Sequence, residues 1–292
     1  MNHDAAMAVV EIKDGIGKIL WAAHAERYSK IKNDHYLNQA IVNEAMTYGP
    51  FNKVVYYEKP WLKKTRQFYA GQYGTALSYT ELPSWHLEHF GIKIDEYVKH
   101  HDSHAAAGYF TSPFTDATIL TVDAIGEWDT VSISTAEKVW IERKETIKYP
   151  HSIGILYSAF THRCGLKPAE EEYILMGMAA YGKPIYKDDI YNDFVHQHPF
   201  KLKQNLHRGL GDWHPEADVM DLAASIQAVT EECLAALWER ASKYGSRNLV
   251  YAGGVALNCA ANRVLANLGL FDNIWIIPVS YTHLTLPTSN GV

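Results

Sequence analysis

The N-terminal part of the chain shows apolar and polar positions in a strand pattern first and a helical pattern afterwards. Residues 8–12 form a strand pattern, residues 13–15 a Lys-Asp-Gly turn, and residues 18–24 a second strand pattern, which together predict a β-hairpin. Residues 34–49 are then expected to form a helix, and residues 53–58 a further strand.

A second strand-rich stretch repeats this order. It has strand patterns at residues 117–122, 130–134 and 138–142. Strands that alternate with helices in this way favour an α/β architecture over a helical bundle or a β-sandwich. Because the hairpin pattern occurs twice, we expect a duplicated fold with a cleft between two lobes, at residues 1–115 and 116–278.

The clearest helical pattern covers residues 219–244. Asp218 precedes it as a candidate N-cap, and Gly245 follows it where a C-cap glycine is common. Apolar residues recur through it at helical spacing, namely Leu222, Ile226, Val229, Cys233 and Leu237. This regular spacing predicts a long helix that packs on the core.

A β-Gly-Gly-α-β unit comes directly after that helix. Its parts are a strand at residues 248–251, Gly253 and Gly254, a helix at residues 256–268 and an apolar run at residues 274–277. Two readings of the glycines stay open: a nucleotide approaches the bare backbone, or the helix packs closely on the strand. Residues 185–215, which are polar and rich in histidine, are expected to lie outside the core.

Composition narrows the class of protein. The net charge of -6 gives no general attraction to nucleic acid or anionic membrane. No run reaches the ~18 apolar residues of a membrane span, and the N-terminus has no secretion-signal pattern, so a cytoplasmic protein is expected. Cys164, Cys233 and Cys259 are too far apart for a CxxC metal knuckle, and their odd number argues against a disulfide framework. We expect them to be buried as small apolar residues.

Two histidines give the first candidate chemistry. His100 and His104 are four residues apart where a strand pattern gives way to a helix that Asp102 or Ser103 is expected to cap. On a helix this spacing places both imidazoles on one face, where they can share a metal ion. The alternative is that they are ordinary surface or core histidines, since the chain has 15 histidines in all.

Asp123 ends the apolar strand pattern and is followed by a turn that contains Gly126 and Glu127. A carboxylate in this position can complete a metal site, and the amides of such a turn can bind phosphate oxygens. The alternative is a plain hairpin with Asp123 as a turn cap.

In residues 176–182 we interpret the methionines as packing residues and leave the roles of Gly177 and Gly182 open. No nucleophile elbow, Walker loop or H-E-x-x-H motif is present.

Six segments in the same order resemble the O-carbamoyltransferase family of the nodulation-factor, cephalosporin and tobramycin type. Its N-terminal domain in turn resembles the transferase domain that makes threonylcarbamoyl tRNA. The segments are Asn-His-Asp-Ala-Ala at residues 2–6, Glu-Arg-Tyr-Ser-Lys-Ile-Lys at 26–32, His-His-Asp-Ser-His-Ala-Ala at 100–106, Val-Asp-Ala-Ile-Gly-Glu at 122–127, Glu-Tyr-Ile-Leu-Met-Gly-Met-Ala-Ala-Tyr-Gly at 172–182 and Ala-Gly-Gly-Val-Ala-Leu-Asn at 252–258.

The resemblance implies an actin-like ATPase fold, a duplicated ribonuclease H-like architecture with nucleotide between two lobes. It implies transfer of a carbamoyl group from carbamoyl phosphate, through carbamoyl adenylate made with ATP, to a hydroxyl of a sugar-like or other small acceptor. A divalent metal, iron in some relatives, is implied as cofactor. Neither a membrane nor a nucleic acid is expected as partner.

The resemblance also assigns roles to residues. It implies His100, His104 and Asp123 as metal ligands. The nucleotide would contact Gly126, Glu127, Gly253, Gly254 and Asn258. Catalytic roles fall on His3, Asp4 and Lys32, of which His3 would take the proton of the acceptor hydroxyl and Lys32 would offset phosphate charge.

Some positions depart from the family pattern. Ala124 stands where the family has glycine, and Met1 falls where a first strand is expected, so this sheet looks clipped. Residues 279–292 resemble translated adaptor sequence, and we expect a non-native tail there, with a natural flexible tail as the alternative. The chain would then be a fragment without a further metal-ligating aspartate and without the C-terminal domain that forms carbamoyl adenylate.

Two other functions fit the same residues. A transferase of the tRNA-modifying type, or an actin-like ATPase or kinase, would keep the fold and change the acceptor. A truncated, inactive remnant would keep the fold without the activity. Acceptor profiling and metal analysis separate these alternatives.

Overall fold

The structure, a computed structural model, describes residues 5–196 and 199–277. By contacts within the chain it divides into two compact units, the first ending at Val98 and the second beginning at Lys99. The sequence placed a lobe boundary at residue 115. The helix at residues 100–111 contacts the sheet of the second unit instead, and therefore groups with it.

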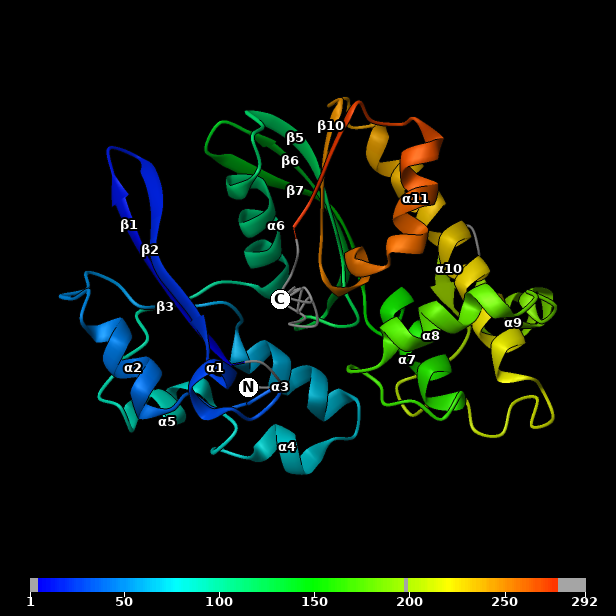
Figure 1. Ribbon diagram of the computed structural model, residues 1–292, viewed down its shortest axis with the longest axis horizontal. Helices are drawn as coiled ribbons and strands as arrows, with labels where there is room; N and C mark the ends of the chain where they lie inside the picture. The colour runs from blue at the N-terminus through cyan, green and yellow to red at the C-terminus, as the bar shows by residue number, and fades with distance from the viewer. Residues whose placement is uncertain (1–4, 197–198, 278–292) are drawn as a thin grey trace, which may run out of the picture. The chain divides into compact units, whose positions relative to one another are not determined.

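The first unit is built from short elements around a small core (Figure 1). Its elements are β1 (Ala6–Lys13), β2 (Ile16–His24), α1 (Glu26–Ser29), α2 (Gln39–Met46), β3 (Val55–Tyr56), α3 (Pro60–Tyr69), α4 (Tyr73–Leu77), α5 (Pro83–Glu88) and β4 (Glu96–Tyr97). Strands β1 and β2 pair in antiparallel fashion, and β3 pairs with β4 in parallel. The buried core of this unit consists of Ile41, Val42, Tyr56, Leu87, Ile92 and Ile94.

The predicted hairpin is confirmed. Asp14 and Gly15, at the turn, have φ angles of 53° and 77°, the left-handed values that a tight two-residue hairpin turn requires. The helix predicted at residues 34–49 is shorter, because Asn38 caps α2 by accepting hydrogen bonds from the amides of Ala40 and Ile41.

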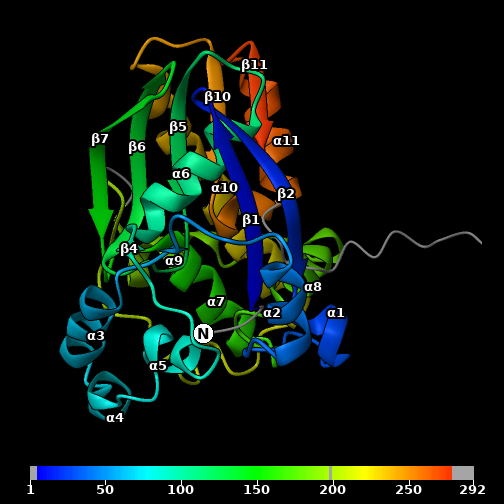
Figure 2. The same cartoon turned by 90° about the vertical axis from the view of Figure 1, so that its left-hand side faces the viewer.

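The second unit has one five-stranded sheet covered by helices. Its elements are α6 (His100–Thr111), β5 (Asp116–Val122), β6 (Asp129–Glu137), β7 (Trp140–Lys148), α7 (Ile153–Arg163), α8 (Glu172–Met178), η1 (Ala179–Tyr181), α9 (Lys187–Phe194), β8 (Val195–His196), β9 (Lys201–Leu202), α10 (Val219–Ser242), β10 (Asn248–Ala252), η2 (Gly254–Leu257), α11 (Cys259–Leu268) and β11 (Asn273–Ile276). The strand order is β11-β10-β5-β6-β7 (Figure 2).

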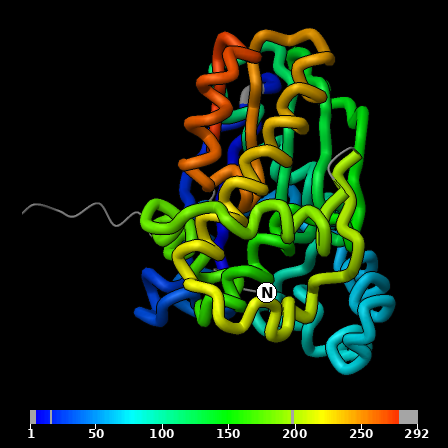
Figure 3. Tube along the Cα trace, turned by 90° about the vertical axis from the view of Figure 1, so that its right-hand side faces the viewer, coloured from blue at the N-terminus to red at the C-terminus, as the bar shows by residue number. Residues whose placement is uncertain are grey.

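The sheet combines two kinds of pairing. Strands β5, β6 and β7 form an antiparallel meander, whereas β10 pairs in parallel with β5 and β11 in parallel with β10. Helix α6 lies on one face, with α10 and α11 on the other (Figures 1 and 3). Since both faces are covered, β5 is buried at every position after Asp116 and lacks the alternation of a half-exposed strand.

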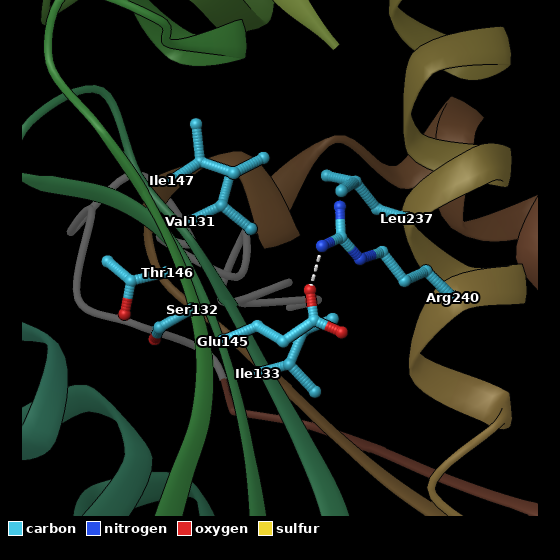
Figure 4. Close-up of a pocket in the computed structure, with 8 residues that line it drawn as sticks. All are labelled: Val131, Ser132, Ile133, Glu145, Thr146, Ile147, Leu237 and Arg240. Carbon is cyan, nitrogen blue, oxygen red and sulfur yellow. Dashed lines mark ion pairs between the residues drawn. The ribbon is translucent and has the colours of Figure 1, made fainter. Parts of the chain in front are cut away.

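An ion pair and a hydrogen bond connect the C-terminal part of helix α10 to β7, the edge strand of the sheet. Arg240 forms an ion pair with Glu145 of β7 (Figure 4). Tyr244 donates a hydrogen bond to the same carboxylate. Next to this contact, a cavity of about 10 Å³ between Leu237 and the sheet has the size of a single water molecule. The contact fixes the long helix against the meander.

Helix α10 begins at the residue that the sequence predicts, whereas helix α11 begins later than predicted. Asp218 caps α10 by accepting a hydrogen bond from the amide of Met220. Helix α11 begins at Cys259, three residues after the predicted start, because residues 254–257 form a 3₁₀ turn and Asn258 caps the helix.

Three other expectations are wrong. Ile190 and Phe194 of α9 are buried, so residues 185–215 contribute to the core. Cys233 is buried as expected, but Cys164 is half-buried and Cys259 is exposed. Neither Asp102 nor Ser103 caps α6, whose N-cap residue, Lys99, makes no side-chain cap bond.

Among the residues that the structure describes, no helix is long and apolar enough to cross a membrane.

Candidate metal centre

Three side chains converge at the carboxyl end of β5. The Nε2 atom of His100 donates to Oδ2 of Asp123 over 2.8 Å, and His104 Nε2 lies 3.0 Å from His100 Nε2 and 3.4 Å from Asp123 Oδ2. The possible ligand atoms of the three residues all lie within 4.8 Å of one another. The two histidines predicted to share a helix face therefore do so, and Asp123 meets them from another element.

The donor set suits a divalent metal. Two imidazole nitrogens 3.0 Å apart can hold only one proton between them, so at least one presents its lone pair. Neutral imidazole and carboxylate are the usual nitrogen and oxygen ligands of divalent transition metals. All three side chains are at most 17% exposed, which limits competition from solvent.

The charge state of Asp123 is favourable for a cation. Burial by itself would raise the pKa of this carboxyl group, but its interactions with the His100 and His104 imidazoles outweigh burial and hold the pKa well below its usual range. The other carboxylate oxygen, Oδ1, accepts a hydrogen bond from the amide of Ala124 over 2.8 Å. The carboxylate is thus ionised and fixed in orientation.

The N-terminus of helix α7 packs against the loop that carries Asp123 and holds it in place. Ser152 is the N-cap of α7, and its hydroxyl also donates to the carbonyl oxygen of Ala124 over 2.6 Å. A Cβ atom on Gly154 would lie 2.5 Å from the Cα of Ala124, so the glycine permits this close approach. A serine before an apolar helix is a capping signal that is visible in the sequence, but Ser152 was not among the predicted residues.

Glu127 and Gly126 contact α6 in the structure. The Glu127 carboxylate accepts from the backbone amide of His100 at 3.0 and 3.2 Å, which supplies the cap that Lys99 lacks. A Cβ atom on Gly126 would lie 3.0 Å from Cδ2 of His101, and the Gly126 amide donates to the carbonyl oxygen of Asp129. Glu127 thus positions the helix that carries the histidines, and the lack of a Cβ at Gly126 lets the turn lie close to this helix.

His101 lies between the two candidate ligands in sequence but points into the core. It is 0% exposed, and its Nδ1 atom is 3.1 Å from the hydroxyl of Ser132. Burial lowers the pKa of His101 to about 3, so the ring is neutral. The segment therefore assigns adjacent histidines to different tasks.

The glycine loop (Gly253–Asn258) lies beside Asp123. Ala252, the last residue of β10, pairs in register with Thr121, which brings Gly253 next to Val122. Gly253 has a φ of 92°, and a Cβ atom there would lie only 2.3 Å from the carbonyl oxygen of Val122. The carboxyl ends of two neighbouring parallel strands thus present the carboxylate and the glycines together, the usual place for a ligand in such sheets.

Asn258 ends the glycine loop and is engaged with the protein. Its Oδ1 atom accepts from the amide of Ala261 and from Nε2 of Gln227, each over 3.0 Å. Its Nδ2 atom donates to Oε1 of Gln227 over 2.9 Å. The sequence analysis did not identify Gln227, although a glutamine among buried positions of a long helix is a detectable signal.

The roles of the predicted catalytic residues remain predictions. Lys32 is exposed and belongs to the first unit, whereas the three candidate ligands belong to the second. His3 and Asp4 lie outside the described residues, as do residues 279–292 of the expected tail.

The sequence is similar to carbamoyltransferases. A family model described as "Carbamoyltransferase N-terminus" matches residues 86–282, which include all three candidate ligands and the glycine loop. Nodulation protein NolNO of Sinorhizobium fredii is 25% identical over 96% of this chain and 44% of its own length. The uncharacterized protein sll1178 of Synechocystis sp. is 34% identical over 95% of this chain and 53% of its own length. The chain therefore spans about half the length of these curated relatives.

A comparison with solved structures gives a distant likeness. A Ppx/GppA phosphatase of Aquifex aeolicus matches with 12% identity and a TM-score of 0.25, over 78% of this chain and 88% of that chain. At this TM-score the likeness does not establish a shared architecture.

Proposed function

Because this chain belongs to the carbamoyltransferase family, in the part described as the N-terminus, we propose that it is the metal- and nucleotide-binding part of an O-carbamoyltransferase. The proposed reaction takes a carbamoyl group from carbamoyl phosphate, through carbamoyl adenylate formed with ATP, to a hydroxyl group of a sugar-like or other small acceptor. The observation that carries the proposal is the convergence of His100, His104 and Asp123 at the end of β5.

In this proposal the three converging residues hold a divalent metal, with iron as the candidate from the resemblance. The metal would supply Lewis-acid stabilisation of negative charge on phosphate oxygens. Asp123 contributes the negative charge of the site, since its carboxylate stays ionised. Glu127 and Ser152 keep the helix and the loop that carry the ligands in place.

The glycine loop is the proposed nucleotide site. Its first residue lies beside Val122, so a phosphate group bound there would be near the metal ligands. The absence of a Cβ at Gly253 and Gly254 lets a nucleotide approach the backbone closely. His3, Asp4 and Lys32 remain the proposed catalytic residues, with His3 taking the proton of the acceptor hydroxyl and Lys32 offsetting phosphate charge.

We also propose that the complete protein has the actin-like ATPase fold that the resemblance implies. The support comes from the second unit alone. An antiparallel meander with two parallel strands added beside its first strand is the arrangement of a ribonuclease H-like half-fold, and β11-β10-β5-β6-β7 has this order.

The first experiment tests the metal centre with Co²⁺ as the probe, because its absorption reports nitrogen and oxygen ligation directly. The full chain is expected to bind one Co²⁺. His104→Ala and Asp123→Asn should each weaken binding by about 100-fold or more, since each removes one of three protein ligands. The control is His162→Ala, an exposed histidine on α7 of the same unit. Equal Co²⁺ affinity in all four proteins would contradict the site.

The second experiment tests the reaction. Carbamoyl adenylate is supplied directly with a panel of sugars and other polyols, and carbamoylated products are detected by mass spectrometry. Transfer by the wild type and its loss in Asp123→Asn would support the proposal. In a parallel reaction with ATP in place of carbamoyl adenylate, hydrolysis of ATP without transfer to any acceptor would favour the ATPase alternative.

A further inference from the structure

A buried glutamine connects three elements behind the glycine loop. Gln227 projects from the middle of α10 and is 6% exposed. Its Oε1 atom accepts hydrogen bonds from the hydroxyl of Tyr157 over 3.0 Å and from Nδ2 of Asn258 over 2.9 Å. Its Nε2 atom donates to Oε1 of Glu231 over 2.8 Å and to Oδ1 of Asn258 over 3.0 Å. Both donors and both acceptor positions of this carboxamide are therefore used.

The pair formed by Gln227 and Asn258 is reciprocal, since each amide donates to and accepts from the other. Its orientation is fixed, because the Gln227 nitrogen must also face the Glu231 carboxylate, which only accepts. A side-chain amide that is buried and fully hydrogen-bonded has one low-energy arrangement, and breaking one bond leaves a partner unsatisfied. The pair thus specifies where Asn258 lies.

Asn258 transmits this position to the loop. Its Oδ1 atom also caps α11 by accepting from the amide of Ala261, and its backbone amide closes the 3₁₀ turn by donating to the carbonyl oxygen of Val255. At the other end, Gly253 is confined against Val122 of β5. The loop is therefore fixed at both ends, by the sheet on one side and by Gln227 on the other.

We propose that Gln227 is a positioning residue for the glycine loop, and that Asn258 acts by holding this loop and not by contacting adenosine. The inference rests on the proposed function, in which the loop binds ATP. Gln227 itself touches no substrate. Through Asn258, it fixes the loop backbone, which is the part that contacts the nucleotide in this proposal.

The test uses the full chain and the variant Gln227→Met, which keeps the volume and removes all four hydrogen bonds. ATP binding is measured by calorimetry, Co²⁺ binding by absorption, and amide hydrogen exchange by mass spectrometry. ATP affinity is expected to fall about 10-fold, with faster exchange at residues 253–258. Co²⁺ affinity should stay within about 2-fold, because none of the four bonds reaches a metal ligand.

The matched control is Ser225→Ala, which also removes hydrogen bonds of a buried α10 side chain, to the Tyr186 amide and the Asp221 carbonyl. Equal ATP affinity and equal loop exchange in Gln227→Met and Ser225→Ala would overturn the inference. If Gln227→Met does not fold, Asn258→Ser replaces it, because serine is a good N-cap residue for α11 and removes both hydrogen bonds with Gln227 without adding a charge. Faster loop exchange in Gln227→Met than in a wild type that itself binds no ATP would leave the positioning role standing and refute the nucleotide proposal.

Discussion

At the scale of single residues, the candidate site depends on atoms that the chain keeps in one orientation. Asp123 divides its carboxylate between two tasks: Oδ1 accepts from the next amide, and Oδ2 faces the two imidazoles. His101, directly beside His100, is turned into the core and bonded to Ser132. Neighbouring histidines of one segment thus have different surroundings, because successive helix positions face in different directions.

Gly253 gives a residue-scale prediction with a close control. Gly253→Ala is expected to destabilise the protein by about 3 kcal/mol or more, for two reasons. The new Cβ would clash with the Val122 carbonyl oxygen, and alanine is strained at a positive φ. Gly245 has almost the same φ, 91° against 92°, with no atom within 4 Å of its built Cβ. Gly245→Ala should therefore cost only about 1 kcal/mol. Denaturant unfolding measures both, and equal losses would contradict the close packing of the glycine loop.

At the scale of elements, helix α6 receives its N-terminal cap from another part of the chain. Its N-cap residue, Lys99, offers no acceptor, and the Glu127 carboxylate accepts from the amide of the first helical residue. A carboxylate at this end also stabilises the helix dipole. The turn after β5 therefore carries one candidate metal ligand, Asp123, and fixes the helix that carries the other two candidates.

This arrangement predicts that a residue outside the ligand set influences metal affinity. Glu127→Ala should weaken Co²⁺ binding by about 5-fold, since a lost cap costs about 1 kcal/mol and loosens the first turn of α6. Glu127→Gln, which keeps one acceptor oxygen, should lose less. The control is Glu137→Ala, an exposed carboxylate at the end of β6. Unchanged Co²⁺ affinity in Glu127→Ala would show that the cap does not determine the ligand geometry.

At the scale of the whole molecule, the candidate metal centre belongs to one of the two compact units. His100, His104 and Asp123, with the residues that position them, all lie in the unit that begins at Lys99. The five-stranded sheet of this unit has its own buried core, which includes Ala105, Ile119 and Val250. The unit therefore contains what a metal site requires.

The corresponding prediction concerns a fragment of residues 99–292. It is expected to fold and to bind Co²⁺ with an affinity within about 3-fold of the full chain, because the ligands and their supports come from this unit. Circular dichroism checks the fold, and Co²⁺ titration measures the affinity. A folded fragment that does not bind Co²⁺ would show that the first unit contributes to the site.

The hairpin, the strands of the meander, helix α10 and the β10–α11–β11 unit were predictable from the sequence, because they depend on local signals. Helices α3, α4, α5 and α7 were not predicted. The hairpin turn at Asp14, the Asp218 cap and the apolar stripe of α10 are each contained in a few neighbouring residues. Boundaries were less accurate where a side chain outside the pattern intervened. Asn258 delays α11 by three residues, and Asn38 shortens α2.

What the sequence by itself determined is the chemistry that is available: two imidazoles four residues apart, a carboxylate after a buried strand, and two glycines after another. Tertiary structure decided which of these atoms meet. The parallel pairing of β5 with β10 brings Gly253 beside Val122, and Glu127 and Gln227 acquire their positioning contacts with residues 27 and 31 positions away. Such contacts depend on strand pairing and helix packing, which no local pattern encodes, because they exist only after distant segments have come together.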